Sequence, residues 1–187
     1  MKIRSIFFLL IFCFNTLHSS EWIAELRGGY FYPTSEKFRD IYKSGCLEGE
    51  IEISKTCREN WMGWGNVNYL QKNGRSIGFH NKTTLQMIPI SLGCKYKFLM
   101  CNSLSPYLGA GLTYTIFEIK NDSDFVKKHV TKGGFGFVIK SGLHIDLSES
   151  FLLDLFSDYY YQEIHFYTNR NINVGGFKIG MGFGYRF

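Results

Sequence analysis

The last segment of the sequence alternates strictly between two kinds of residue. Residues 174–187 read VGGFKIGMGFGYRF, and from Phe177 onward every second position is large and apolar or aromatic. The intervening positions hold glycine, Lys178 and Arg186. A period of two predicts a β-strand whose two faces meet different surroundings. One face presents an unbroken row of bulky apolar side chains, and the other presents only glycine and cations.

Seven further segments alternate in a similar way. The predicted strands are 21–32, 48–55, 61–70, 84–98, 106–119, 134–147, 151–162 and 174–187. Pro89 falls inside the fourth strand, and we place it on the inward face at a bulge, because proline cannot donate to a strand ladder. Long and short connections alternate, as in barrels that cross a membrane. The pattern predicts an all-β fold, a closed eight-stranded antiparallel up-and-down transmembrane β-barrel, since an open sheet would expose its edges to lipid.

The first twenty residues differ from the rest of the chain. Lys2 and Arg4 precede the apolar run 6–14, and polar residues follow it. This order is typical of a cleaved secretory signal peptide, and an apolar run of about nine residues is too short for a membrane-spanning helix, which needs roughly 20. We therefore expect a signal peptide at 1–20 and a barrel domain at 21–187.

Composition agrees with a membrane barrel. Aromatic residues make up 18% of the chain, and 20 glycines stand against 3 prolines. A mean hydropathy of -0.10 is compatible with membrane insertion, because only alternate residues of a barrel strand meet lipid. The formal net charge is +5, and two of these charges belong to Lys2 and Arg4. So small an excess gives no reason to expect a nucleic-acid partner.

Cysteine usage leaves several arrangements open. The segment after the predicted signal peptide holds Cys46, Cys57, Cys94 and Cys101. In an oxidising compartment four cysteines allow three complete pairings, and the sequence does not choose among them. No spacing among them is typical of a metal site. We expect no metal and no cofactor.

The closing strand resembles the C-terminal strand of bacterial outer-membrane β-barrel proteins, which the barrel-insertion machinery recognises. Phe183, Tyr185 and Phe187 occupy the aromatic positions of that signature. The chain as a whole resembles the small eight-stranded barrels of the OmpA transmembrane-domain and OmpX type. The resemblance implies a location in the outer membrane of a Gram-negative bacterium. It also implies a role as a structural anchor, an adhesion surface, a narrow pore or, in some members, an enzyme.

Charged residues recur at inward positions of the predicted strands. The candidate interior charge network comprises Glu25, Arg27, Lys140, His144, Asp154, Asp158, Lys178 and Arg186. Because the last three strands are neighbours, Asp154 and Asp158 are expected between the cationic residues of the two flanking strands. One interpretation is an ion pathway. We favour the other, a salt-bridged plug in a barrel just wide enough for its own side chains.

The predicted long loops carry cations, namely Lys72, Arg75, Lys127, Lys128 and Lys132. They suit contact with lipopolysaccharide phosphates or acidic host glycans, or simple solvation beside anionic lipid. We expect a structural or adhesin-like role, with a narrow pore or ion channel as the alternative. An outer-leaflet lipid-modifying enzyme is disfavoured, since no catalytic motif is present. The expected partners are outer-membrane lipid, lipopolysaccharide, the insertion machinery and a host or envelope surface ligand.

Overall fold

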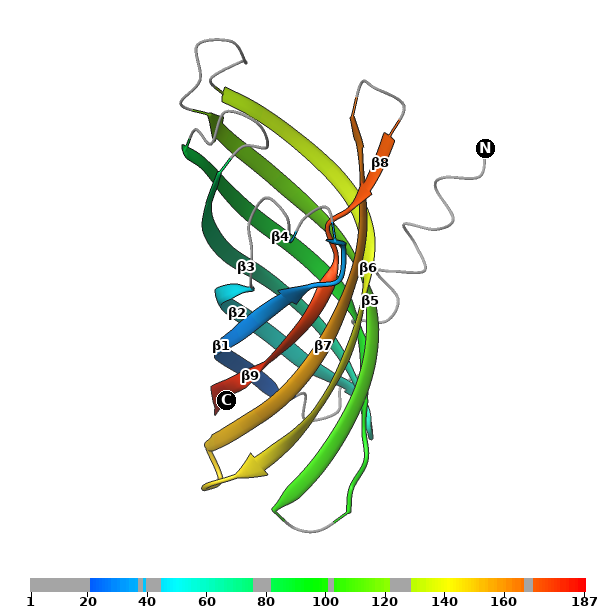
Figure 1. Cartoon of the computed structure of the whole chain (residues 1–187). Helices are drawn as coiled ribbons and strands as arrows, with labels where there is room; N and C mark the ends of the chain where they lie inside the picture. The colour runs from blue at the N-terminus through cyan, green and yellow to red at the C-terminus, as the bar shows by residue number, and fades with distance from the viewer. Residues whose placement is uncertain are drawn as a thin grey trace, which may run out of the picture.

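The computed structural model forms a closed barrel of strands inclined to its long axis (Figure 1). It describes residues 21–36, 39, 45–75, 82–100, 103–121, 129–166 and 170–187. The segment 1–20, predicted as a signal peptide, lies outside these residues.

The described residues form nine strand segments. They are β1 (Trp22–Pro33), β2 (Cys46–Arg58), β3 (Trp61–Arg75), β4 (Lys82–Lys97), β5 (Leu104–Asn121), β6 (His129–Asp146), β7 (Phe151–Phe166), β8 (Arg170–Asn173) and β9 (Gly176–Arg186). Strands β1 to β7 pair in chain order, and β9 pairs with both β7 and β1, so the sheet closes on itself. All pairings are antiparallel.

Strands β8 and β9 are two parts of one wall strand. Against β7, Asn173 of β8 is opposite Glu163, and Gly176 of β9 is opposite Tyr160, a step of three residues on each side. The register therefore continues unchanged across the interruption. At Gly175 the chain passes so close to β7 that a methyl group would lie 2.2 Å from the carbonyl oxygen of Tyr160. The barrel thus has eight wall strands, as the sequence predicts.

The strands run further than the sequence pattern predicts at one end of the barrel. Three segments assigned to loops, 71–82, 120–132 and 163–173, contain the ends of β3 to β8. We call this the outer end; β1 begins and β9 ends at the opposite, inner end (Figure 1). A strand that projects beyond a bilayer meets water on both faces, so its apolar alternation disappears while its hydrogen bonds remain.

The predicted bulge at Pro89 is wrong, although its inward position is correct. Pro89 is buried and stands opposite Thr115 with no shift in the β4–β5 register. The register shifts instead between Thr56 and Arg58 of β2, where that strand approaches its short turn.

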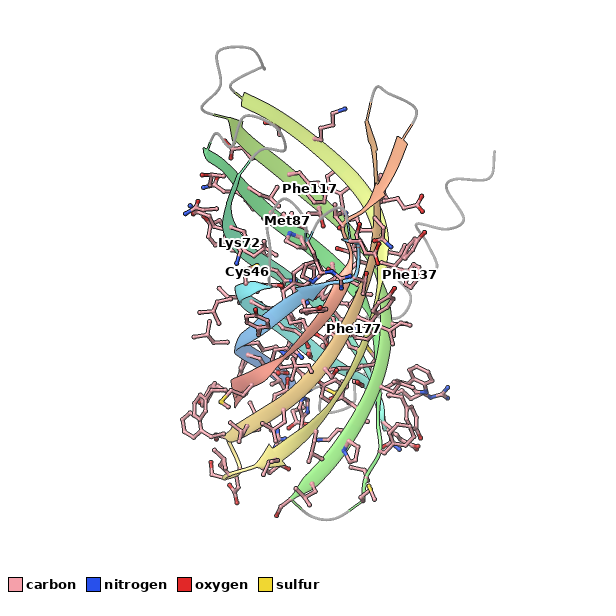
Figure 2. All side chains as sticks on the ribbon, viewed as in Figure 1. Cys46, Lys72, Met87, Phe117, Phe137 and Phe177 are labelled. Atoms are coloured by element: carbon pink, nitrogen blue, oxygen red, sulfur yellow. The ribbon has the colours of Figure 1, made fainter. Side chains whose placement is uncertain are left out.

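The outside of the wall is apolar over most of its surface. Phe137 is 41% exposed and Phe177 is 49% exposed, whereas Met87 and Phe117 are buried inside (Figure 2). Soluble monomers rarely expose contiguous apolar patches larger than a few hundred Å², so this surface suits lipid. No helix among the described residues is long and apolar enough to cross a membrane.

The interior is layered. An apolar layer fills the outer part and comprises Phe31, Leu70, Leu85, Met87, Phe117 and Val174. A smaller one near the inner end comprises Ile23, Met62 and Leu152. Charged residues and the cluster Trp64, Val138 and Tyr160 lie in the barrel between them. We call the buried charged residues the charged layer; they are Glu25, Arg27, Glu48, Glu50, Glu52, Lys95, Lys140, His144, Asp154, Asp158 and Lys178.

Candidate functional site: the charged layer inside the barrel

Arg27 of β1 is the hub of the charged layer. Its guanidinium lies 2.7 Å from Glu50, 3.2 Å from Glu52, 2.9 Å from Asp154 and 3.4 Å from Asp158. The Arg27 side chain is fully buried. A buried charge is tolerated only when it is paired and hydrogen-bonded, and Arg27 meets this condition with carboxylates from both sides of β1, on β2 and β7.

Strand β2 supplies a row of acids at alternate positions, all pointing inward: Glu48, Glu50 and Glu52. Three lysines from other strands face this row. The pairs are Lys178–Glu48 at 3.2 Å, Lys140–Glu50 at 2.7 Å and Lys95–Glu52 at 2.8 Å, with closer contacts from Lys178 to Glu50 and from Lys140 to Glu52. Since the lysines come from β9, β6 and β4, the ion pairs tie distant parts of the wall together.

Aromatic rings fill the space between these charges. The Arg27 guanidinium carbon lies 3.8 Å from the centre of the Phe156 ring, and the Lys140 ammonium lies 4.6 Å from that of Trp64. Both contacts are within the range of cation–π attraction. Every member of the charged layer is at most 5% exposed, so the layer is a packed structure. A cavity of about 10 Å³, roughly the space of a single water molecule, lies where it meets the outer apolar layer, lined by Glu48, Phe31 and Val174 among others.

The register explains part of the expected arrangement. Asp158 of β7 is opposite both Lys140 of β6 and Lys178 of β9, and Asp154 is opposite His144. The candidate residues on β1 join the same layer from across the closing strand. Arg186, by contrast, is half-buried at the inner end of β9, where it pairs with Glu21 and, at 2.9 Å, with Asp146. It does not contact the charged layer.

Four members of the charged layer are absent from the sequence-based network: Glu48, Glu50, Glu52 and Lys95. Tyr107, which is not a charged residue but contacts the layer, is absent as well. The Tyr107 hydroxyl donates to Asp154 at 3.0 Å and accepts from Arg27 at 3.1 Å. A signal for Lys95 was present, because it lies on the inward face of the predicted strand 84–98. Glu48 sits at the edge of the predicted strand 48–55, so its alternation was hard to see. The role of Tyr107 depends on contacts across the barrel.

The candidate insertion residues lie along the outside of β9. Phe183, Tyr185 and Phe187 are all exposed, and Phe151 of β7 packs beside the first two with ring centres 5.4 and 5.3 Å apart. Phe187 also exchanges two backbone hydrogen bonds with Trp22, at 2.9 and 3.0 Å. These residues therefore border the seam where the barrel closes.

The candidate basic residues are only partly described. The Lys72 ammonium donates a hydrogen bond of 2.8 Å to the carbonyl oxygen of Gly45, and Lys132 is half-buried near the start of β6. The side chain of Arg75, and the whole of Lys127 and Lys128, lie outside the described residues.

The cysteine positions remove one of the three complete pairings. Cys46 begins β2 and Cys57 stands one residue before its end. At about 3.3 Å per residue their Cα atoms are tens of ångströms apart, far beyond the roughly 7 Å limit for a disulfide. Cys94 lies exposed on β4, and Cys101 is outside the described residues.

Residues 6–187 match the sequence model of a protein family, described as the outer membrane protein beta-barrel domain. No functionally curated protein matches the chain. Among solved structures, Neisserial surface protein A is 15% identical, with 91% of this chain and 100% of that one covered and a TM-score of 0.62. OprG from Pseudomonas aeruginosa is 15% identical over 90% and 96%, with a TM-score of 0.66.

Ail, the attachment invasion locus protein of Yersinia pestis, is 13% identical over 91% of this chain and 100% of that one, with a TM-score of 0.58. Ail has also been solved in complex with the heparin analogue sucrose octasulfate. Identities this low establish a shared fold and leave the function of this chain to its own residues.

Proposed function

Because this chain belongs to the outer membrane protein beta-barrel domain family, we propose that it is a closed scaffold that presents a binding surface at its outer end. The observation that carries this proposal is the packed interior. Arg27, the acidic row of β2 and its lysines fill the middle of the barrel, with apolar layers toward both ends. A filled lumen supports a role on the outside of the barrel and weighs against a narrow pore.

The proposed ligand is a polyanion, either a sulfated host glycan or lipopolysaccharide phosphate. By sequence, the connections of the outer end and the strand ends beside them contain five cations, Lys72, Arg75, Lys127, Lys128 and Lys132. Lysine and arginine side chains are the usual partners of sulfate and phosphate groups. The complex of Ail with a heparin analogue lends support, since Ail has a similar fold.

Placement in the envelope follows from the family: the chain is an outer-membrane barrel. Export by a cleaved signal peptide at 1–20 completes the proposal, together with insertion by the barrel-assembly machinery. No catalytic role is part of it.

Binding to immobilised heparin tests the proposed ligand. The variant Lys127→Ala/Lys128→Ala/Lys132→Ala should elute at clearly lower salt than the unmodified barrel, because each lost ion pair with a polyanion lowers the salt dependence of binding. The matched control is Lys55→Ala/Arg58→Ala/Lys97→Ala, which removes the same charge from the inner end. If both variants lose heparin affinity equally, net charge alone would explain the binding, and this would contradict the proposal.

A further inference from the structure

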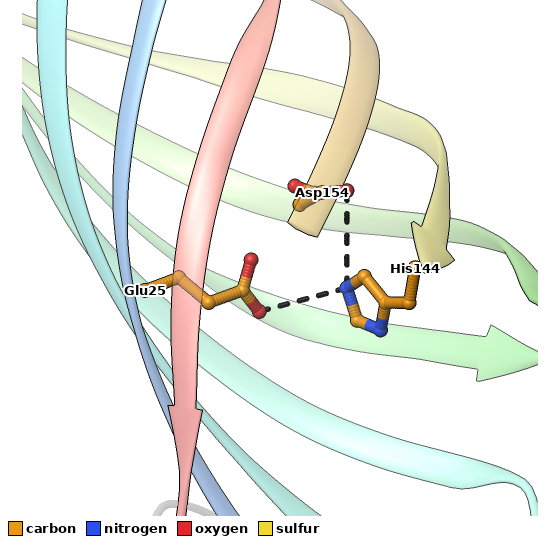
Figure 3. A group of neighbouring side chains, drawn as sticks. All are labelled: Glu25, His144 and Asp154. Atoms are coloured by element: carbon orange, nitrogen blue, oxygen red, sulfur yellow. Dashed lines mark ion pairs between the residues drawn. The ribbon is translucent and has the colours of Figure 1, made fainter. Parts of the chain in front are cut away.

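Three buried ligand-type side chains converge near the inner part of the barrel: Glu25, His144 and Asp154 (Figure 3). The Nε2 atom of His144 lies 3.6 Å from a Glu25 oxygen and 3.9 Å from an Asp154 oxygen. One ligand atom from each residue falls within 4.8 Å of the other two. Contrary to the sequence-based expectation of no metal, we propose that this group binds one divalent transition-metal ion.

The strand register builds the group. His144 of β6 and Asp154 of β7 stand directly opposite each other. Glu25 of β1 reaches them across β9, whose residues at this level are Gly182 and Gly184. A methyl group on Gly184 would lie 3.1 Å from the Glu25 side chain. It would also lie 2.8 Å from Leu152, so glycine at this position lets the Glu25 and Leu152 side chains lie close over β9.

The unsatisfied imidazole of His144 indicates that a ligand binds at this group. The residue has no exposed surface, and neither of its ring nitrogens has a hydrogen-bond partner among the described residues. One oxygen of Glu25 is likewise buried without a partner. Leaving a buried donor or acceptor unsatisfied destabilises the fold, and such groups are rare in folded proteins. Nε2 faces both carboxylates, so a metal ion between the three residues would satisfy it.

The charge of the layer points the same way. The charged layer contains six carboxylates, Glu25, Glu48, Glu50, Glu52, Asp154 and Asp158. Among the residues that the structure describes, it contains four fixed cations, Arg27, Lys95, Lys140 and Lys178. With a neutral histidine, the ionised layer carries an excess of two negative charges. An uncompensated buried charge is very costly, and a single divalent ion at this group would balance the excess.

The neighbouring donors hold the two carboxylates but do not use all their lone pairs. Lys95 lies 3.4 Å from the Oε1 atom of Glu25, and Arg27 lies 2.9 Å from the Oδ2 atom of Asp154. The Tyr107 hydroxyl donates to the Asp154 carboxylate, 3.0 Å from Oδ1 and 3.1 Å from Oδ2. Such contacts hold a metal-binding carboxylate in place without using all its lone pairs. The ring of Tyr107 also packs on His144, with centres 4.7 Å apart, and fixes its orientation.

One imidazole and two carboxylates suit a first-row ion such as Zn²⁺, Mn²⁺ or Fe²⁺. Zn²⁺ binds nitrogen and oxygen ligands at about 2.0–2.2 Å, so the three ligand atoms need only small movements to share one ion. The bound ion would join β1 to β6 and β7 across the closing strand. Its role is to lock the barrel at the seam.

The test is to fold the full barrel in detergent with Zn²⁺, desalt it and measure metal per chain by mass spectrometry. We expect one ion per unmodified barrel. Glu25→Gln and His144→Gln should each reduce retained metal about tenfold or more, as for loss of a metal ligand or its support. Glu48→Gln is the matched control, because it removes a buried carboxylate of the same layer outside the group. Heat-modifiable migration verifies that each variant is folded.

Two results would overturn the proposal: no stoichiometric metal in the unmodified barrel, or equal metal in the Glu25→Gln, His144→Gln and Glu48→Gln variants. The visible absorption spectrum of the unmodified barrel loaded with Co²⁺ is a test that needs no variant to fold. If only weak bands appear, the ligands are nitrogen and oxygen, which supports the site. An intense thiolate-to-metal band would assign the ion to the cysteines and overturn it.

Discussion

At the scale of single residues, Arg27 decides how the interior is filled. One guanidinium with five N–H donors pairs with four carboxylates, and its face packs on Phe156. Lysine could not replace it, because an ammonium is a compact point charge without a planar fork. The positive charge of Arg27 lies between the surrounding carboxylates and offsets their mutual repulsion.

Removing Arg27 should therefore be costly. We expect Arg27→Met to lower the free energy of unfolding by about 3–5 kcal/mol, because it leaves several buried carboxylates without their shared partner. Urea unfolding in detergent or lipid vesicles measures the loss. Arg58→Met, at an exposed position beside a turn, is the control and should change stability by less than about 0.5 kcal/mol. Similar losses in both variants would show that Arg27 is not the hub.

At the scale of elements, the closing strand β9 shapes the interior because its inward face carries few side chains. Apart from Lys178 and the half-buried Arg186, the inward positions of β9 are glycines. Side chains from β1 and β7 therefore pass over β9 and meet, as Arg27 and Asp154 do across Gly182. A strand with larger inward residues would hold these groups apart.

A pair of glycines at the β1–β9 seam tests this view. A methyl group on Gly180 would lie 2.1 Å from the backbone oxygen of Gly28, whereas one on Gly28 would meet nothing within 4 Å. We expect Gly180→Ala to destabilise the barrel by about 1–3 kcal/mol through overpacking. Gly28→Ala should be neutral or stabilising by up to about 1 kcal/mol, because it restricts the unfolded chain. Thermal unfolding of both variants is the measurement, and equal effects would contradict the close approach.

The aromatic row on the outside of β9 bears on assembly. We predict that Phe187→Ser slows insertion severalfold and leaves more chain in the periplasm, because Phe187 lies at the seam beside Trp22. Fractionation of cells after pulse labelling measures this. Phe177→Ser is the control, since it removes an equally apolar, exposed ring from the far end of the same strand. Equal membrane yield for Phe187→Ser and the unmodified chain would count against an insertion signature.

At the scale of the whole molecule, the barrel is a cylinder filled in layers. Apolar clusters lie toward both ends, and ion pairs from six of the eight wall strands meet between them. At the outer end, β3 to β8 extend beyond the segments whose apolar alternation predicted strands (Figure 1). This division fits the proposal that the interior provides stability and the outer end provides the binding surface.

The filled interior predicts that the barrel does not conduct ions. Purified barrel added to a planar lipid bilayer should give no discrete conductance steps, because side chains occupy the lumen along its length. A trimeric porin in the same membrane provides the positive control. Regular steps from this barrel would show a continuous water path and favour the pore over the scaffold.

Local alternation was enough to predict the class of fold, the eight wall strands and the lipid-facing rows. Lipid on one face and a packed interior on the other impose a period of two that is visible in any single strand, as in residues 174–187. The same signal fails where strands leave the membrane, because water on both faces removes the contrast. This is why the ends of β3 to β8 were assigned to loops.

Only the tertiary structure decided which inward residues meet. Lys140 and Glu50 are far apart in sequence, and nothing in either strand indicates the other. Barrel closure and strand stagger set which inward positions share a level, and both depend on all the pairings at once. The same geometry gathers Glu25, His144 and Asp154 around one point. The sequence by itself determined the two faces of each strand, and closure determined the chemistry of the inner one.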